Sequence, residues 1–186
     1  MLTDLAEVRR IAESKQADNL RFRRILKARP LPNDPFHIIA AEVETKIDCT
    51  VCANCCKHTR VAVSSDEMEA LAGKLEITRL EVMQRFTVRD PRDSTKTVLS
   101  QKRDACVFLI DNLCSVYEAR PKACRDFPNL TTSEAASDDL LAAAATRSVY
   151  CPIAFNTLEV YKERLGYKPL PEVPKPRTFG VFEPRT

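Results

Sequence analysis

The first 29 residues place apolar side chains at the three- and four-residue spacing of an amphipathic helix. Leu5, Val8 and Ala12 share one face, and Phe22 continues that face after a polar interruption. The apolar stripe is narrow, so this N-terminal helix is expected to pack either on the rest of the chain or on a protein partner.

A second helix is predicted from about Asp34 to Lys46, after a proline-rich link that ends the first helix. Its apolar positions Phe36, Ile39, Ala40 and Val43 would be buried. This helix leads directly into the most unusual stretch of the chain.

Capping boxes, in which Ser or Thr is followed three residues later by Glu, mark the starts of three further helices. We expect helices from Ser64 to Leu75 and from Thr78 to Phe86. The third box, Thr131 to Glu134, opens an alanine-rich helix from Ala135 to Arg147. A last short helix is expected from Asn156 to Leu165.

Alternation of apolar and polar residues is weaker and local. Thr95 to Gln101 and Ala105 to Ile110 are predicted to pair as a hairpin, with a turn at Asp111-Asn112 after them. Arg60 to Val63 is a short extended piece. Only 3 glycines argue against a sheet-rich fold. The predicted fold is therefore mainly α with a small β-hairpin.

These patterns divide the chain into three parts. Residues 1–47 form an N-terminal helical segment, residues 48–167 a compact cysteine-rich metal-binding domain, and residues 168–186 an extended Pro-rich tail. The tail also holds apolar residues, so it is expected to lie along its own domain or, with the N-terminal helix, on a protein partner.

Composition limits the class of protein. The net charge of +3 is too small to indicate nucleic-acid binding, and no apolar run is long enough for a membrane span. The N-terminus lacks the apolar stretch of a signal peptide, so a cytoplasmic location is expected. In a reducing compartment, 8 cysteines favour metal ligands or redox groups over disulfides.

Four of those cysteines fall within eight residues. Cys49, Cys52 and Cys55 form two overlapping Cys-x-x-Cys turns, which direct sulfurs towards one metal ion. The same spacing occurs in ferredoxin-type sites, where a remote Cys followed by Pro completes the cluster, and Cys151 has that context. Zinc, iron and an iron–sulfur cluster all remain open.

The adjacent Cys56 is expected to point away from Cys55, because neighbouring side chains usually diverge. It would then serve a second centre or stay a free thiol. All eight cysteines are candidate metal ligands, and they could divide into two four-sulfur sites of undetermined membership: Cys49, Cys52, Cys55, Cys56, Cys106, Cys114, Cys124 and Cys151.

An enzyme would need a labile, non-cysteine ligand at one centre, for which His58, Asp104 and Asp111 are the nearest candidates. His37 lies within a predicted helix and is expected to be structural. Neither histidine makes a convincing general base.

The spacing resembles a known family. Cys49-x-x-Cys52-x-x-Cys55-Cys56 is followed by Cys106-Val-Phe-Leu-Ile-Asp and by Arg120-Pro-x-x-Cys124-Arg-x-Phe-Pro128. This combination is similar to the CxxCxxCC zinc- or iron-chelating family over roughly Cys49 to Pro152. The family commonly has Gly after the second cysteine, where this chain has Ala53.

The resemblance implies zinc or iron, including the option of an iron–sulfur cluster. Flagellin lysine N-methylases are similar in the cysteine pattern, so methyl transfer is an alternative. However, the chain has no Gly-rich loop for a nucleotide-like methyl donor.

Charged and aromatic residues of the family-like segment suggest how a cluster would be surrounded. Arg120 and Arg125 flank Cys124 and are the predicted cofactor-binding residues, since guanidinium groups offset thiolate charge. Glu118 and Asp126 are expected to orient these arginines. The site would be walled from water by Phe108, Tyr117 and Phe127.

Three functions follow from these observations. The first is a metal-cluster protein with a structural or electron-transfer role. The second is a metal-dependent enzyme, and the third is a metal-stapled adaptor in a larger complex. The first and third need no substrate pocket and are favoured.

Overall fold

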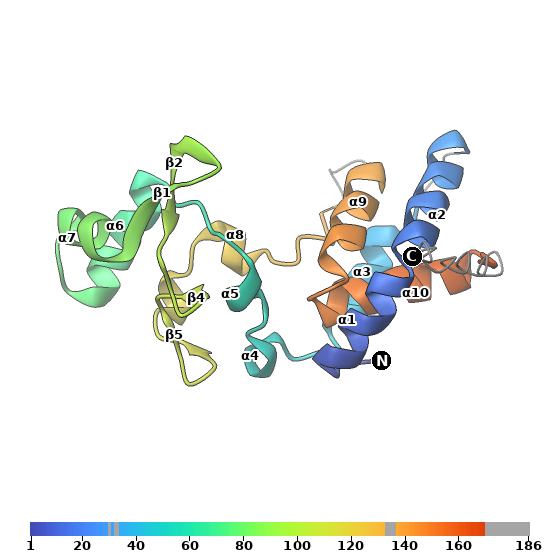
Figure 1. The fold of residues 1–186 in the computed structure, drawn as a ribbon, viewed down its shortest axis with the longest axis horizontal. Helices are drawn as coiled ribbons and strands as arrows, with labels where there is room; N and C mark the ends of the chain where they lie inside the picture. The colour runs from blue at the N-terminus through green and yellow to red at the C-terminus, as the bar shows by residue number, and fades with distance from the viewer. Residues whose placement is uncertain (30, 32–33, 133–136, 170–186) are drawn as a thin grey trace, which may run out of the picture.

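The computed structural model of the chain describes residues 1–29, 31, 34–132 and 137–169. The expected tail lies outside these residues except for its first two positions, and the third capping box lies partly outside them. The fold has two lobes joined by a narrow middle (Figure 1). One lobe is helical and the other combines helices with short hairpins.

The helical lobe brings the two ends of the described chain together. Tyr161 is fully buried at its centre, with edge-to-face contacts to Phe22 and Phe36. Its helices are α1 (Leu5–Ser14), α2 (Gln16–Ala28), α3 (Phe36–Glu44), α9 (Ser137–Arg147) and α10 (Pro152–Arg164).

The mixed lobe has its own hydrophobic core, which includes Leu71, Val82 and Phe108. Its strands pair as three separate antiparallel hairpins, β1–β2, β3–β4 and β5–β6. Its elements are α6 (Ser65–Leu75), α7 (Arg79–Phe86), β1 (Thr87–Asp90), β2 (Asp93–Leu99), β3 (Gln101–Lys102), β4 (Ala105–Cys106), β5 (Leu109–Ile110), β6 (Leu113–Cys114) and the 3-10 helix η1 (Tyr117–Ala119).

Three single-turn helices occupy the middle of the molecule, between the two lobes: α4 (Cys49–Cys52), α5 (Cys55–His58) and α8 (Lys122–Arg125). The chain crosses from the helical lobe through α4 and α5, and it returns through α8. We call this region the junction. Because each lobe has a separate core, the junction determines how the lobes are held together.

The N-terminal helix is not continuous as expected, but is broken at Lys15. Val8 and Ala12 of α1 pack with Phe155 of α10, whereas Phe22 of α2 belongs to the main core of the helical lobe. The two apolar stripes meet different neighbours, and the break lets each helix face its own. Lys15 marks the break and forms an ion pair with Glu159.

Helix α3 buries Phe36, Ile39, Ala40 and Val43, as predicted. The last helix, α10, begins at Pro152 rather than at Asn156. Proline suits the first helical position because it has no backbone N–H to satisfy there.

The predicted helices α6 and α7 are confirmed, with both capping boxes formed. The hairpin prediction is only partly right. The strand expected at Thr95–Gln101 corresponds mainly to β2, which pairs with β1 rather than with the following segment. Strand β1 was missed because it follows α7 without a break and because Asp90-Pro91 looks like a terminator.

Residues 105–110 instead contribute to two small hairpins. Strand β4 pairs with β3, and β5 pairs with β6 around the predicted turn at Asp111-Asn112. Both turn residues have positive φ, which Asn and Asp tolerate better than most residues. Ala62 in the predicted extended piece bridges to Val98. The mainly α class with small antiparallel strand pairs is confirmed.

Among the described residues, no helix combines the length and apolar character needed to span a membrane.

Candidate metal centre

The eight cysteines gather on the junction and on the edges of the lobes that face it. All are free thiols, and seven are partly or largely exposed, whereas Cys151 is buried at the start of α10. Cys49 and Cys52 lie on α4, Cys55 and Cys56 on α5, Cys106 on β4, Cys114 on β6 and Cys124 on α8.

Local structure explains how α4 and α5 present their cysteines. The Asp48 carboxylate accepts a hydrogen bond of 2.8 Å from the backbone N–H of Thr50 and caps α4. Ala53 then takes a left-handed conformation, with φ of 47°, which ends α4 and lets α5 begin in a new direction. A left-handed conformation costs a residue with a Cβ about 1 kcal/mol, so the site favours glycine.

Two asparagines connect the junction to both lobes. The amide of Asn54 donates a hydrogen bond of 2.7 Å to the carbonyl oxygen of Tyr150, in the helical lobe. The amide of Asn112, in the β5–β6 turn, donates one of 2.9 Å to the carbonyl oxygen of Val51. Lys57 also donates to the Asn112 side chain, at 3.0 Å. Neither asparagine was singled out from the sequence.

The returning segment is held in a similar way. The backbone N–H of Lys122 in α8 donates a 2.8 Å hydrogen bond to the Glu67 carboxylate of α6. Farther along, Phe127 stacks on Tyr150, with ring centroids 6.1 Å apart. Therefore α8 is anchored to the mixed lobe at its start and leads to the helical lobe at its end.

A first group of thiols is defined by the electrostatic influence of its members on one another: Cys49, Cys52 and Cys151. Burial raises the pKa of Cys151 to about 12, and negative charge on Cys49 and Cys52 adds to this increase. Burial also raises the pKa of Cys49, and the charges of Cys52 and Glu44 raise it further. These effects place the three sulfurs in one electrostatic neighbourhood.

A second group is formed by Cys56, Cys106, Cys114 and Cys124. Burial raises the pKa of Cys124 to about 12, and charges on Cys106, Cys56 and Cys114 contribute next. Burial also raises the pKa of both Cys106 and Cys114, and each is affected further by the charge of Cys56. Among the motif cysteines, Cys56 is the one whose charge contributes to the raised pKa of Cys106, Cys114 and Cys124.

Cys55 is influenced by both groups. A hydrogen bond with Cys56 raises the pKa of the Cys55 thiol and lowers that of Cys56. The two adjacent thiols therefore influence each other's protonation, and the expectation that they serve different centres stays a prediction. Cys55 also experiences the charges of Cys124 and Cys151, one from each group.

Arg120 is the cation that faces the thiols. Its charge counteracts the burial that raises the pKa of Cys49, Cys114 and Cys124, and it also favours the Cys56 thiolate. The guanidinium is held over the Tyr117 ring, 3.5 Å from the centroid, and donates a 2.9 Å hydrogen bond to the Tyr117 carbonyl oxygen.

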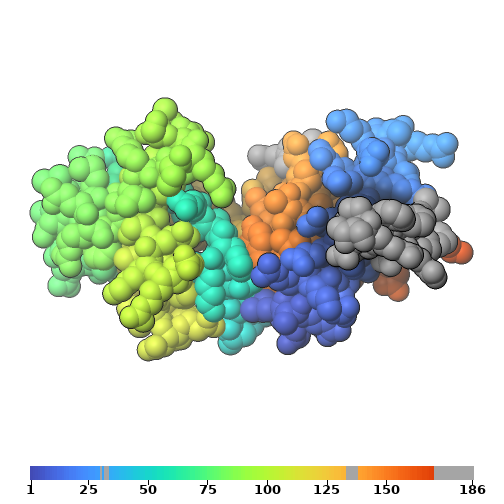
Figure 2. Space-filling model, viewed as in Figure 1, coloured from blue at the N-terminus to red at the C-terminus, as the bar shows by residue number. Residues whose placement is uncertain are grey.

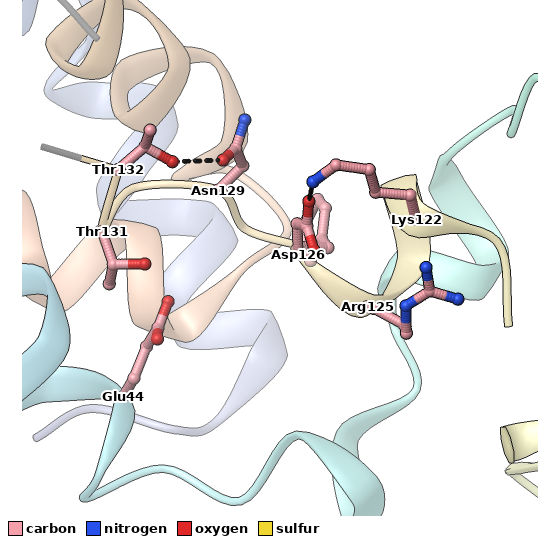
Figure 3. A pocket seen from close by; sticks show the side chains of 8 residues that line it. Glu44, Lys122, Arg125, Asp126, Asn129, Thr131 and Thr132 are labelled. Carbon is pink, nitrogen blue, oxygen red and sulfur yellow. Dashed lines mark hydrogen bonds and ion pairs between the residues drawn. The ribbon is translucent and has the colours of Figure 1, made fainter. Parts of the chain in front are cut away.

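Arg125 has a different position from Arg120. It donates a hydrogen bond to the Arg120 carbonyl oxygen and borders a polar cavity of about 700 Å³ beside α8. Figure 3 shows Arg125 and Lys122 on one side of this cavity and Glu44 on the other. Arg125 thus supports the backbone of Arg120.

The predicted orienting carboxylates have other partners. Asp126 pairs with Lys122 of the same helical turn, and Glu118 pairs with Lys74 of α6 at 3.0 Å. The expectation that they orient the arginines is therefore wrong. Both acids instead meet lysines on the surface.

The predicted aromatic wall is only partly present. Phe108 is buried in the core of the mixed lobe, and Phe127 packs against the helical lobe. Tyr117 is 43% exposed and covers Arg120 rather than closing the site from water.

The three candidates for a non-cysteine ligand are all exposed. His58 lies beside Tyr150, with ring centroids 5.4 Å apart, and Asp104 and Asp111 occupy hairpin turns. His37 lies in α3, as expected.

The cysteine side chains suit a zinc or iron ion by their chemistry, but their arrangement does not form a coordination site. Within the described ranges, no group of three or more His, Cys, Asp or Glu side chains is arranged closely enough to hold an ion. The donors themselves suit zinc or iron, since both accept four thiolates.

The chain belongs to the CxxCxxCC family, described as a "putative zinc- or iron-chelating domain", whose model matches residues 48–152. No curated protein and no solved structure matches it. Family membership supports metal binding, with zinc or iron as the metal. The matched range starts at the cap of α4 and ends at the start of α10, so it spans all eight cysteines.

Proposed function

We propose that this protein holds zinc or iron in two four-thiolate centres and that these centres join its two lobes. Cys49, Cys52, Cys55 and Cys151 form the first centre. Cys56, Cys106, Cys114 and Cys124 form the second. The role is structural or redox, and an iron–sulfur cluster in either centre is part of the proposal.

The observation that carries this proposal is the grouping of the thiols at the junction. Each group contains sulfurs from the motif and sulfurs from a lobe: Cys151 from the helical lobe, and Cys106 and Cys114 from the mixed lobe. Cys55 has neighbours in both groups, and its Cys-x-x-Cys spacing from Cys52 supports the first.

The protein's contribution is to position donors and balance charge. Four thiolates around a divalent ion leave a net negative charge, which Arg120 would offset in the second centre. A bound metal would replace the thiol protons and supply a cross-link between elements far apart in sequence. With iron, it would also supply a one-electron redox couple.

Exposure of the candidate non-cysteine ligands supports a structural or redox role over catalysis by an open metal site. A centre with four thiolates has no free coordination position. Neither Asp104 nor Asp111 lies in a buried pocket beside the thiols.

The test is anaerobic purification of the full chain, followed by elemental analysis, sulfide analysis and a visible spectrum. We expect stoichiometric zinc in a colourless protein, or iron with matching sulfide in a brown one. All eight thiols should react with a thiol reagent only after metal removal. A metal-free protein with eight reactive thiols under these conditions would contradict the proposal.

Cys52→Ser gives a second test that does not depend on the identity of the metal. It should reduce the metal content, while Val51→Ala, a change at the exposed neighbouring residue, should not. Full metal content in Cys52→Ser would remove this residue from the ligand set.

A further inference from the structure

The two lobes make little direct contact with each other. The closely packed pairs of elements lie within one lobe, except that α5 of the junction packs on β4. Among the residues that the structure describes, no ion pair joins one lobe to the other. The space-filling view is hollowed between the β1–β2 hairpin and α9 (Figure 2). A cavity of about 460 Å³ has lining residues from both lobes, among them Asp90 and Tyr150. Packing between the lobes therefore does little to fix their arrangement.

The three junction helices are attached to the mixed lobe. Asn112 of the β5–β6 turn donates its hydrogen bond to Val51 of α4, and α5 packs on β4. The Glu67 carboxylate of α6 accepts the hydrogen bond from the backbone N–H of Lys122 in α8. The mixed lobe and the junction therefore act as one unit, which we call the combined body. It carries all four proposed ligands of the second centre: Cys56, Cys106, Cys114 and Cys124.

The combined body meets the helical lobe at Tyr150, between α9 and α10. The carbonyl oxygen of Tyr150 accepts the hydrogen bond from Asn54, and its ring lies beside that of His58. The next residue, Cys151, is the one cysteine of the helical lobe and is part of that lobe's hydrophobic core. The first centre, which includes Cys151 and Cys49, would therefore connect two bodies, whereas the second centre lies within one.

Binding of a metal in the first centre requires movement between these bodies. In the part of the chain that the structure describes, no three Cys, His, Asp or Glu side chains are arranged closely enough to hold an ion. Bonds from sulfur to zinc are about 2.3 Å long. To bring Cys49 and Cys52 within that distance of an ion bound by Cys151, α4 must move relative to α10. The sparse contacts between the lobes allow such a movement.

We propose that the protein is a metal-responsive switch, in which a metal in the first centre fixes the helical lobe against the combined body and loss of that metal releases it. This inference rests on the two centres of the proposed function and adds that the first one alone controls the arrangement of the lobes. Cys49 is exposed, whereas the other seven thiols are half-buried or buried. A competing thiol or carboxylate chelator can therefore reach the first centre, so the switch would respond to the supply of free metal.

The test is a distance measurement between the lobes of the full chain. Nitroxide labels are attached at Leu20 of α2 and Leu80 of α7, which are 53% and 56% exposed. Ketone-bearing amino acids at these positions carry the labels and leave the cysteines intact. Pulsed electron paramagnetic resonance gives the distribution of label distances with zinc, which is diamagnetic, and after its removal by a chelator. We expect a narrow distribution with zinc and a broad one without it.

Cysteine variants separate the two centres. Cys151→Ser and Cys114→Ser should each lose half of the bound zinc, measured by elemental analysis of the same samples. With zinc present, Cys151→Ser should have the broad distribution and Cys114→Ser the narrow one. Cys49→Ser should also have the broad distribution, and this change at an exposed position keeps the test valid if Cys151→Ser does not fold. Circular dichroism checks the fold of each variant.

An unchanged distribution after complete zinc removal would overturn the switch and leave metal binding intact. Equal broadening in Cys114→Ser and Cys49→Ser would also overturn it, because both centres would then hold the lobes together. A chain that binds neither zinc nor iron would contradict the proposed function itself, and the switch with it.

Discussion

The side-chain amide of Asn54 donates a hydrogen bond of 2.7 Å to the carbonyl oxygen of Tyr150, the residue before Cys151. This bond joins the loop between two motif cysteines to the start of α10, about 100 residues later in the chain. It holds the residue before the remote Cys151 against the loop of the motif.

Asn54→Ala should therefore loosen the first centre. We expect the free energy of unfolding to fall by about 1 kcal/mol, the usual contribution of one hydrogen bond. A chelator should withdraw metal from the first centre faster than from the second, as followed by metal release over time. Asn112→Gly is the matched control, because glycine keeps the positive φ of 65° and removes only the side chain.

Asn112→Gly should instead affect the second centre, since Asn112 holds the β5–β6 turn, next to Cys114, against α4. Equal effects of the two variants on both centres would mean that the asparagines stabilise the whole fold and have no separate role at each centre.

Arg120 and Arg125 should differ in their effect on metal binding, although the sequence gives them equal standing. Arg120→Gln removes the cation that faces four of the thiols, so we expect a loss of metal affinity of about tenfold or more in competition with a chelator. Arg125→Gln should have a smaller effect, because Arg125 acts through the backbone of Arg120. The reverse order would show that Arg125 is the cation that balances the bound centre.

The sequence predicts helix starts better than it predicts features that depend on contacts between distant segments. Ser64 and Thr78 identify α6 and α7 because a capping box is local, and both boxes form as predicted. The break at Lys15 could not be predicted, since it depends on which helices α1 and α2 meet. Strand β1 was missed for the same reason, because its partner β2 decides its conformation.

In the candidate site, too, local patterns can be predicted from the sequence and contacts between distant segments cannot. Spacing alone selects Cys49, Cys52 and Cys55, the following proline adds Cys151, and the count of eight thiols adds the other cysteines. The grouping of Cys56 with Cys106 and Cys114 depends on the crossing of the chain between lobes, which no local pattern contains. Asn54 could have been found only as a conspicuous polar residue between two cysteines, and its partner Tyr150 could not.

Stability at low pH should depend on Asp18 in the helical lobe. Burial raises the pKa of this carboxyl, but hydrogen bonds from Lys162 and Tyr167 and the charge of Lys162 outweigh it, so the pKa lies below the ordinary value of 3.8. A carboxyl with a lowered pKa stabilises the fold above its unfolded pKa. That contribution is lost as the pH falls from about 4 through the folded value.

Asp18→Asn should remove this pH dependence and lower the free energy of unfolding at pH 7 by about 2 kcal/mol, because it removes the nearest counter-charge of a buried lysine and leaves it with Glu159 and Asn19. The Lys162 side chain is only 7% exposed and forms a 2.7 Å ion pair with Asp18. Asp18→Asn with Lys162→Met should recover part of the loss. Denaturant titrations at pH 7 and pH 3 measure both effects, and an unchanged difference between the two pH values in Asp18→Asn would refute them.

The most direct test of two separate centres is the metal content per chain of Cys151→Ser and Cys114→Ser, each purified anaerobically beside the parent protein. We predict that each variant keeps half of the parent's metal and that the double variant keeps none. Complete loss from either single variant, with the fold intact by circular dichroism, would mean one shared centre. Full metal content in either variant would remove that cysteine from the ligand set.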